Sequence, residues 1–122
     1  MGAVLLLGAV VFIQGCVAVA AAGLGVGTVA YIKGDLQAVE AVNLDEVYTA
    51  TQKALDELEF SVTKRSKDVL SAAIVARDAS DKKITIKLSA VEDDATKISI
   101  RVGIFGNETK SRMIYEKIKK YL

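Results

Sequence analysis

The segments ITIKL (residues 84–88) and ISIRV (residues 98–102) decide the fold of this chain. In both, apolar side chains alternate with polar ones, which is the pattern of a β-strand with one buried face and one face in water. The polar connection between them, Val91 to Thr96, is short, and short connections favour antiparallel neighbours over parallel crossovers. The two segments therefore predict adjacent antiparallel strands.

Two further strands precede this pair. In the first, Phe60 and Val62 alternate with Ser61 and Thr63. In the second, four apolar residues share one face, namely Leu70, Ala72, Ile74 and Ala76. The polar connections at 65–68 and 78–82 are again short, so we expect four strands in a meander with one wet face.

Amphipathic helices flank these strands. Asn43 with Glu46 three residues later forms a capping-box-like start. An apolar stripe at helical spacing follows it, formed by Leu44, Val47, Tyr48, Thr51, Ala54, Leu55 and Leu58. Asn107 can cap a last helix whose stripe is Ile114, Ile118, Tyr121 and Leu122. We expect the last helix to cover the sheet.

Together these elements predict a single α+β domain over residues 33–122. An extended segment at 35–41 completes the order β-α-β-β-β-β-α. The expected architecture is an antiparallel sheet of four to five strands with two helices packed on one face.

The N-terminal part of the chain differs in composition from this domain. Residues 1–32 carry no charged side chain, whereas all sixteen Lys and Arg and all fifteen Asp and Glu lie at Lys33 or after it. An apolar run that ends in small residues is typical of a signal peptide. We therefore interpret residues 1–15 as a signal peptide and residues 16–32 as a Gly/Ala-rich tether.

The cysteine at position 16 makes this interpretation more specific. Ile13, Gln14 and Gly15 precede Cys16 in the pattern of a bacterial lipoprotein box, which predicts cleavage before Cys16 and lipidation of its thiol. One departure is the missing positive charge ahead of the apolar run, which a start further upstream would explain. A single cysteine also excludes an intramolecular disulfide.

An uncleaved membrane span is the alternative interpretation of the same segment. Residues 17–32 would reach only about 24 Å as a helix, short of the ~30 Å hydrocarbon core, but joined to residues 2–15 they would cross it. Gly23 and Gly27 have the spacing that lets two membrane helices pack closely. In this alternative the protein oligomerises through its glycine-rich helix; a flexible tether is the other explanation of the glycines.

The composition argues against the common catalytic centres. Without histidine, the chain lacks the commonest general base and transition-metal ligand, and a lipidated Cys16 is no nucleophile. The turn Glu92-Asp93-Asp94 lacks the spaced oxygens of a calcium loop. We expect no enzymatic activity, no cofactor and no metal.

The last helix carries the sharpest functional signal in the domain. A basic amphipathic helix can lie on an anionic membrane or meet an acidic partner. The cations concerned are Lys110, Arg112, Lys117, Lys119 and Lys120. The alternative is that they complement the helix dipole and solvate its outer face. Nucleic acid is not expected as a partner, because the net charge is only +1.

Several segments together resemble a family of short bacterial lipoproteins known only as a domain of unknown function. The resemblance rests on Gly15-Cys16, the Gly/Ala tract to Gly27, and the segments YIKGDL (31–36), NLDEVY (43–48) and IRVGIFG (100–106). It implies a lipid-anchored envelope protein without implying an activity. In element order alone, the domain is also similar to modules of lipoproteins in the outer-membrane barrel assembly machinery.

The expectation is a non-enzymatic lipoprotein of the bacterial envelope. The residue after Cys16 is Val17 rather than Asp, which favours the outer membrane with the domain in the periplasm. Its partners would be the membrane, through the lipid, and an envelope protein, lipid or cell-wall component, through the exposed sheet face or the last helix. A small-ligand-binding domain is the remaining alternative, and the oligomeric state stays open.

Overall fold

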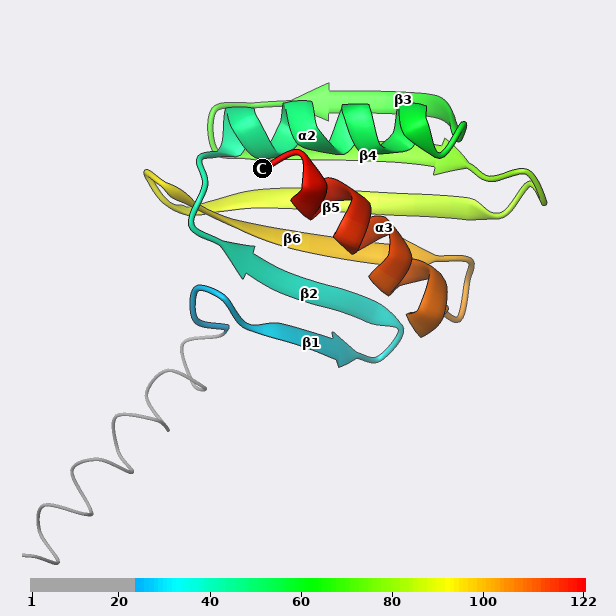
Figure 1. Cartoon of the computed structure of the whole chain (residues 1–122), viewed down its shortest axis with the longest axis horizontal. Helices are drawn as coiled ribbons and strands as arrows, with labels where there is room; N and C mark the ends of the chain where they lie inside the picture. Colours follow the sequence, from blue (N-terminus) through cyan, green and yellow to red (C-terminus); the bar gives the residue numbers. More distant parts are fainter. Residues whose placement is uncertain (1–23) are drawn as a thin grey trace, which may run out of the picture.

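The computed structural model describes residues 24–122, which Figure 1 draws in colour. The elements in chain order are β1 (Val29–Ile32), β2 (Asp35–Glu40), α2 (Leu44–Glu57), β3 (Ser61–Lys67), β4 (Ser71–Arg77), β5 (Lys83–Glu92), β6 (Ala95–Val102) and α3 (Glu108–Lys120). The predicted signal peptide and residues 16–23 of the predicted tether lie outside the described residues.

The six strands form one antiparallel sheet in the order β1-β2-β6-β5-β4-β3. Strands β3 to β6 are the predicted meander, and β2 pairs with the free side of β6. Both helices lie on the same face of this sheet, with α2 over β3, β4 and β5 and α3 across β6 and β2 (Figure 1). The predicted α+β class and the β-α-β-β-β-β-α order are confirmed.

Strand β1 is an addition to the predicted architecture. Residues 29–32 belong to the predicted tether, but in the structure they pair with β2 from Val29 opposite Ala38 to Ile32 opposite Asp35. The turn between the two strands is Lys33-Gly34, and both residues have positive φ, at 51° and 90°, as in the tight turns that join hairpin strands. The sheet therefore has six strands, and the domain begins before Lys33.

The two predicted helix caps are confirmed. Asn43 Oδ1 accepts a hydrogen bond from the Glu46 N–H at 2.9 Å, and Asn107 Oδ1 accepts one from the Lys110 N–H at 3.0 Å. Each side chain thus satisfies one of the backbone donors that a helix start leaves unpaired.

The core lies between the helices and the sheet. Alternate residues of the two central strands point into it, namely Ile84, Ile86, Leu88, Ile98, Ile100 and Val102. Ile114 and Ile118 of α3 are fully buried, but Tyr121 and Leu122 are partly exposed because α3 ends at Lys120. Tyr115 is the buried aromatic residue of α3 instead, and its hydroxyl donates a hydrogen bond to Glu40 on β2. Leu70 also differs from the prediction, since it lies exposed in the β3–β4 turn.

Within residues 24–122, neither helix has the length and apolar character needed to cross a bilayer.

Candidate functional site

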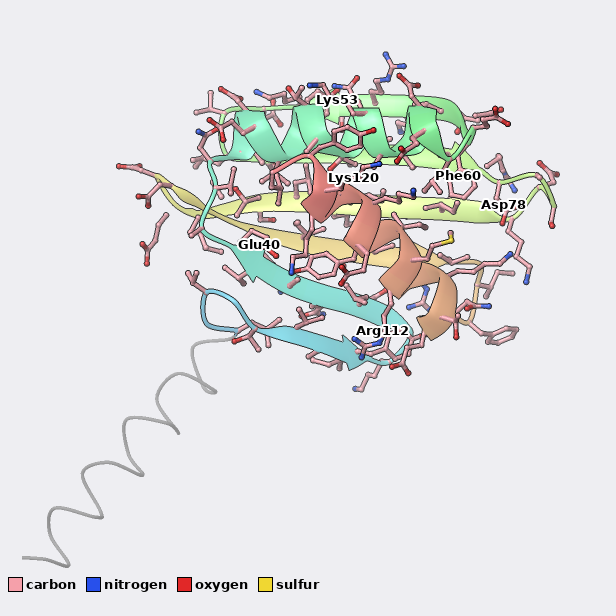
Figure 2. The ribbon with its side chains drawn as sticks, in the orientation of Figure 1. Glu40, Lys53, Phe60, Asp78, Arg112 and Lys120 are labelled. Carbon is pink, nitrogen blue, oxygen red and sulfur yellow. The ribbon has the colours of Figure 1, made fainter. Side chains whose placement is uncertain are left out.

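The cations at the C-terminal end of α3 are engaged with α2. Lys117 Nζ and Lys120 Nζ lie 3.3 Å and 2.9 Å from the two carboxylate oxygens of Glu57, and Figure 2 shows Lys120 where α3 passes α2. Hydrogen bonds from Lys120 and Lys117 lower the pKa of Glu57, and the same contact raises the pKa of Lys120. These two lysines therefore join the helices.

The N-terminal cations of α3 are also paired. Lys110 Nζ lies 3.3 Å from Asp78 Oδ2 in the β4–β5 turn, and Arg112 Nη2 lies 3.0 Å from Glu108 one helical turn earlier. Lys119 Nζ lies 5.6 Å from the centre of the Tyr115 ring. All five predicted contact residues of the last helix thus have partners within the domain, so the helix is not a free cationic surface.

Asp78 accepts hydrogen bonds from backbone N–H groups as well as pairing with Lys110. Its Oδ1 accepts hydrogen bonds from the N–H groups of Ser80 and Lys82 at 2.8 and 2.9 Å. The pKa of Asp78 is lowered, chiefly by the Lys82 N–H and further by Lys110. Asp78 is the first residue of the β4–β5 turn, and Figure 2 shows it near the base of that turn.

The predicted N-terminal sites are mostly beyond the described part of the chain. Ile13, Gln14, Gly15, Cys16 and Gly23 all lie outside it. Gly27 lies in a turn before β1 with φ +83°, and its N–H donates to the Val39 carbonyl oxygen at 2.7 Å. A helix has no residue of this conformation, so the predicted packing of Gly27 on a helix face does not fit its placement.

The face of the sheet that the helices leave uncovered carries a concentration of positive charge. Residues directly opposite each other in an antiparallel pair lie on the same side of the sheet. Val75, Thr85 and Arg101 are opposed in this way, and they lie on the side of the sheet away from the core. The cations on this side, which we call the basic sheet face, are Lys64, Arg77, Lys83, Lys87, Lys97 and Arg101.

Cations outnumber carboxylates on the basic sheet face. Six of the sixteen Lys and Arg residues lie there, whereas the pairing puts two of the fifteen carboxylates there, Asp35 and Glu92. Asp35 is 3.0 Å from Arg101 Nη1. Among residues 24–122, the four lysines of this face form no ion pair with any carboxylate. The face is therefore available to an anionic group from outside.

Two adjoining recesses mark one end of this face. One, of about 390 Å³, is lined by Asp35, Val75, Lys83, Thr85, Lys87, Ser99 and Arg101. The other, of about 520 Å³, is lined by Arg77, Lys82, Lys83, Thr85, Arg101, Gly103, Ile104 and Phe105. Because Lys83, Thr85 and Arg101 belong to both, the two recesses form one cationic surface that ends against two apolar side chains.

Arg101 forms several hydrogen bonds at the end of the basic sheet face beside these recesses. Its Nη1 donates to the Lys33 carbonyl oxygen and to Asp35 Oδ1, each at 3.0 Å. Its Nε and Nη2 donate to the Ile104 carbonyl oxygen at 3.1 and 2.5 Å. One guanidinium therefore ties the β1–β2 turn to the loop between β6 and α3.

The same two segments touch through their glycines. A Cβ atom placed on Gly106, whose φ is +83°, would overlap the backbone of Gly34 and come 2.6 Å from the Tyr31 hydroxyl oxygen. Only a glycine permits both the close approach and the left-handed conformation. The segments YIKGDL and IRVGIFG, far apart in sequence, thus form one structural corner.

Sequence reasoning names the exposed sheet face as a candidate partner surface but misses its cations, for a physical reason. The cations of the basic sheet face occupy alternate strand positions, so no run of charge reveals them, whereas those of α3 are clustered in sequence. One available signal was the pair Ile104-Phe105 between Gly103 and Gly106, two large apolar residues between the predicted strand at 98–102 and the helix capped by Asn107. Among the residues placed by the structure, no group of three or more His, Cys, Asp or Glu is positioned to hold a metal ion.

Comparison with known proteins defines the family of the chain. A search of curated proteins found no match. The family model described as "Protein of unknown function (DUF3568)" matches residues 1–121, which is nearly the whole chain. The chain therefore belongs to the DUF3568 family of proteins of unknown function.

Proposed function

We propose that this protein is a non-enzymatic binding module of the bacterial envelope, held at a membrane by a lipid on Cys16, which binds an anionic partner on its basic sheet face. The observation that carries the proposal is the segregation of charge: a nearly neutral protein places six cations and two carboxylates on the one sheet face that no helix covers.

The anchor is supported by the sequence of the N-terminal segment. Ile13-Gln14-Gly15-Cys16 has the pattern of a lipoprotein box, and the residues before it are apolar throughout. The presence of Val17 rather than Asp after Cys16 favours an outer-membrane position facing the periplasm. The domain would then meet other envelope components while tethered.

The chemistry of the face favours an anionic polymer of the envelope that repeats phosphate or carboxylate groups. Neighbouring strands lie about 4.8 Å apart, and alternate residues of one strand lie about 6.6 Å apart. Cations on β3, β4, β5 and β6 therefore form an array rather than a single pocket. Such an array attracts a repeating anion through summed, salt-sensitive interactions.

The test compares two double variants of the full chain on a column of immobilised heparin, used as a model polyanion. Lys83→Glu with Lys87→Glu reverses two charges on the basic sheet face. Lys53→Glu with Lys119→Glu makes the same change in net charge on exposed residues of the two helices. We expect the first variant to elute at distinctly lower salt than the second, and equal elution would contradict the proposal.

A further inference from the structure

Two adjacent apolar side chains stand out at the end of the basic sheet face. Ile104 and Phe105, in the loop between β6 and α3, are 82% and 88% exposed. Isolated exposed apolar residues are ordinary on protein surfaces, but two large ones side by side at a loop tip mark a candidate contact. Neither contributes to the core of the domain.

The loop that presents them is held by specific contacts. The Ile104 carbonyl oxygen accepts two hydrogen bonds from Arg101, and Gly106 packs against the backbone of Gly34. Gly103 N–H donates to the Lys83 carbonyl oxygen at 2.8 Å. Because the backbone is fixed at both ends of the tip, little further ordering is required when the two side chains become buried in a contact.

The charged side chains that line the recess beside the tip are positive. Ile104 and Phe105 share their recess with Arg77, Lys82, Lys83 and Arg101. The opposite end of the sheet offers a direct contrast, since exposed Val69 and Leu70 line a recess with Asp45, Glu92 and Asp93. Both ends expose apolar side chains, but only one surrounds them with cations.

We propose that Ile104 and Phe105 insert into the surface of an anionic lipid bilayer, with Lys82 and Lys83 against the lipid phosphates. An apolar tip bordered by lysines suits the lipid interface, where side chains reach the acyl region while the cations remain at the headgroups. A protein partner would have to supply an apolar pocket and acidic residues together, whereas an anionic bilayer supplies both without further structure.

This inference rests on the proposed function in one respect, because Arg77, Lys83 and Arg101 belong to both surfaces. It does not follow from the anchor. The described chain enters the domain at the start of β1, which lies at the other end of the strands from the β6–α3 loop (Figure 1). Insertion of the N-terminal segment therefore does not by itself place the loop in the bilayer.

The absence of tryptophan from the sequence allows a local test. In the full chain reconstituted into vesicles, Phe105→Trp puts the only indole at the tip, and Val69→Trp puts it at the other end of the sheet on a residue that is equally exposed. Emission is recorded in phosphatidylglycerol and in phosphatidylcholine vesicles, with and without brominated acyl chains as quenchers.

With phosphatidylglycerol, we expect the indole at position 105 to shift to shorter wavelength and to be quenched, and the indole at position 69 to keep its solvent-exposed emission. Adding Lys82→Glu and Lys83→Glu to Phe105→Trp should reduce the quenching several-fold. Unshifted, unquenched emission at position 105 would overturn the inference. Equal quenching at both positions, or equal quenching at position 105 in phosphatidylcholine, would overturn it as well.

The two proposals fail separately. If heparin elution distinguishes the two double variants but the indole at position 105 stays in water, only the inserted loop is wrong. If that indole inserts but both double variants elute together, only the polyanion-binding face is wrong.

Discussion

Arg101 Nη1 donates a hydrogen bond to the carbonyl oxygen of Lys33, 3.0 Å away and 68 positions earlier in the sequence. The same guanidinium also holds Asp35 and the Ile104 carbonyl oxygen. The candidate site therefore depends on a contact between the N-terminal hairpin and the loop after β6. That contact can be broken without removing any core side chain.

Replacement of Arg101 should destabilise the contact between the β1–β2 turn and the loop after β6. Arg101→Ala removes the donors to two backbone carbonyls and one carboxylate, all near the surface, and we expect it to lower the free energy of unfolding by about 1 to 2 kcal/mol. Arg77→Ala is the matched control, because the Arg77 side chain donates to one backbone carbonyl, that of Asp81. Urea unfolding of both variants checks this, and equal losses would contradict the bracing role of Arg101.

The two glycines that flank the apolar tip should differ in their tolerance of a side chain. Gly103 has φ +74° with open space where a Cβ would lie, whereas a Cβ on Gly106 would overlap Gly34. We expect Gly103→Ala to cost about 1 kcal/mol from backbone strain alone, and Gly106→Ala to cost about 3 kcal/mol or more because of the added clash. Thermal unfolding followed by circular dichroism gives the comparison. A Gly106→Ala protein as stable as Gly103→Ala would mean that the two turns do not touch.

Local pattern was sufficient to predict most of the fold. Periodicity shows that an element packs against a core, and it is visible in the sequence without knowing which element it packs against. Examples are the alternation in residues 84–88 and 98–102 and the apolar stripe after Asn43. Strand β1 was missed because VAYI is short, uncharged and continuous with an apolar tract, so no alternation separates it from the tether. Its identity as a strand depends on pairing with β2.

The site was less predictable, because it depends on register and on distant contacts. Lys83, Lys87 and Lys97 become one surface only when β5 and β6 pair in the observed register. These lysines are divided among strands, whereas the lysines of α3 are close together in the sequence. The sequence therefore predicts a cationic contact surface on the last helix. The position of Glu57 on α2 is what engages Lys117 and Lys120, and helical periodicity does not reveal that contact.

The buried tyrosine of α3 should contribute stability through its hydroxyl. Tyr115 is 3% exposed and donates to Glu40, which Figure 2 shows at the C-terminal end of β2. Tyr115→Phe keeps the packing and removes the donor to a carboxylate, so we expect a loss of about 2 kcal/mol. Tyr48→Phe is the control, since the Tyr48 hydroxyl has no hydrogen-bond partner within residues 24–122. Similar losses for the two variants would argue against the Tyr115–Glu40 bond.

The same hydroxyl predicts an alkaline pH dependence. Burial, and then the bond to Glu40, raise the pKa of Tyr115 above its ordinary value of 10.0. Above pH 10 the unfolded chain releases this proton while the folded protein retains it, so the stability that the group contributes is lost as pH rises. The stability difference between wild type and Tyr115→Phe should narrow from pH 9 to pH 11.5 in urea titrations. A constant difference would be inconsistent with the raised pKa.

At acid pH the corresponding group is Asp78. Its pKa lies below the ordinary value of 3.8, chiefly because the Lys82 N–H donates to it and further because of Lys110. A lowered pKa contributes stability above the ordinary value, and this stability is lost as pH falls through the folded value. Asp78→Asn should therefore be less stable than wild type at pH 6, with the gap closing below about pH 3.8.

Lys110→Met provides the control for this acid dependence. It removes the ion pair but leaves the two N–H donors of the turn in place. We expect it to keep most of the acid-dependent stability, measured as melting temperature between pH 2 and pH 7. Complete loss of that dependence in Lys110→Met would show that the lysine, rather than the turn, sets the pKa of Asp78.

Anchoring of the domain at a membrane through Cys16 is tested most directly by intact mass. The gene would be expressed in a bacterial host together with the sequence upstream of Met1, and the protein extracted from membranes beside a Cys16→Ala version. We expect a mature species that begins at Cys16 and carries acyl mass, absent from the variant. An unmodified mass that retains residues 1–15 in both preparations would contradict the lipid anchor.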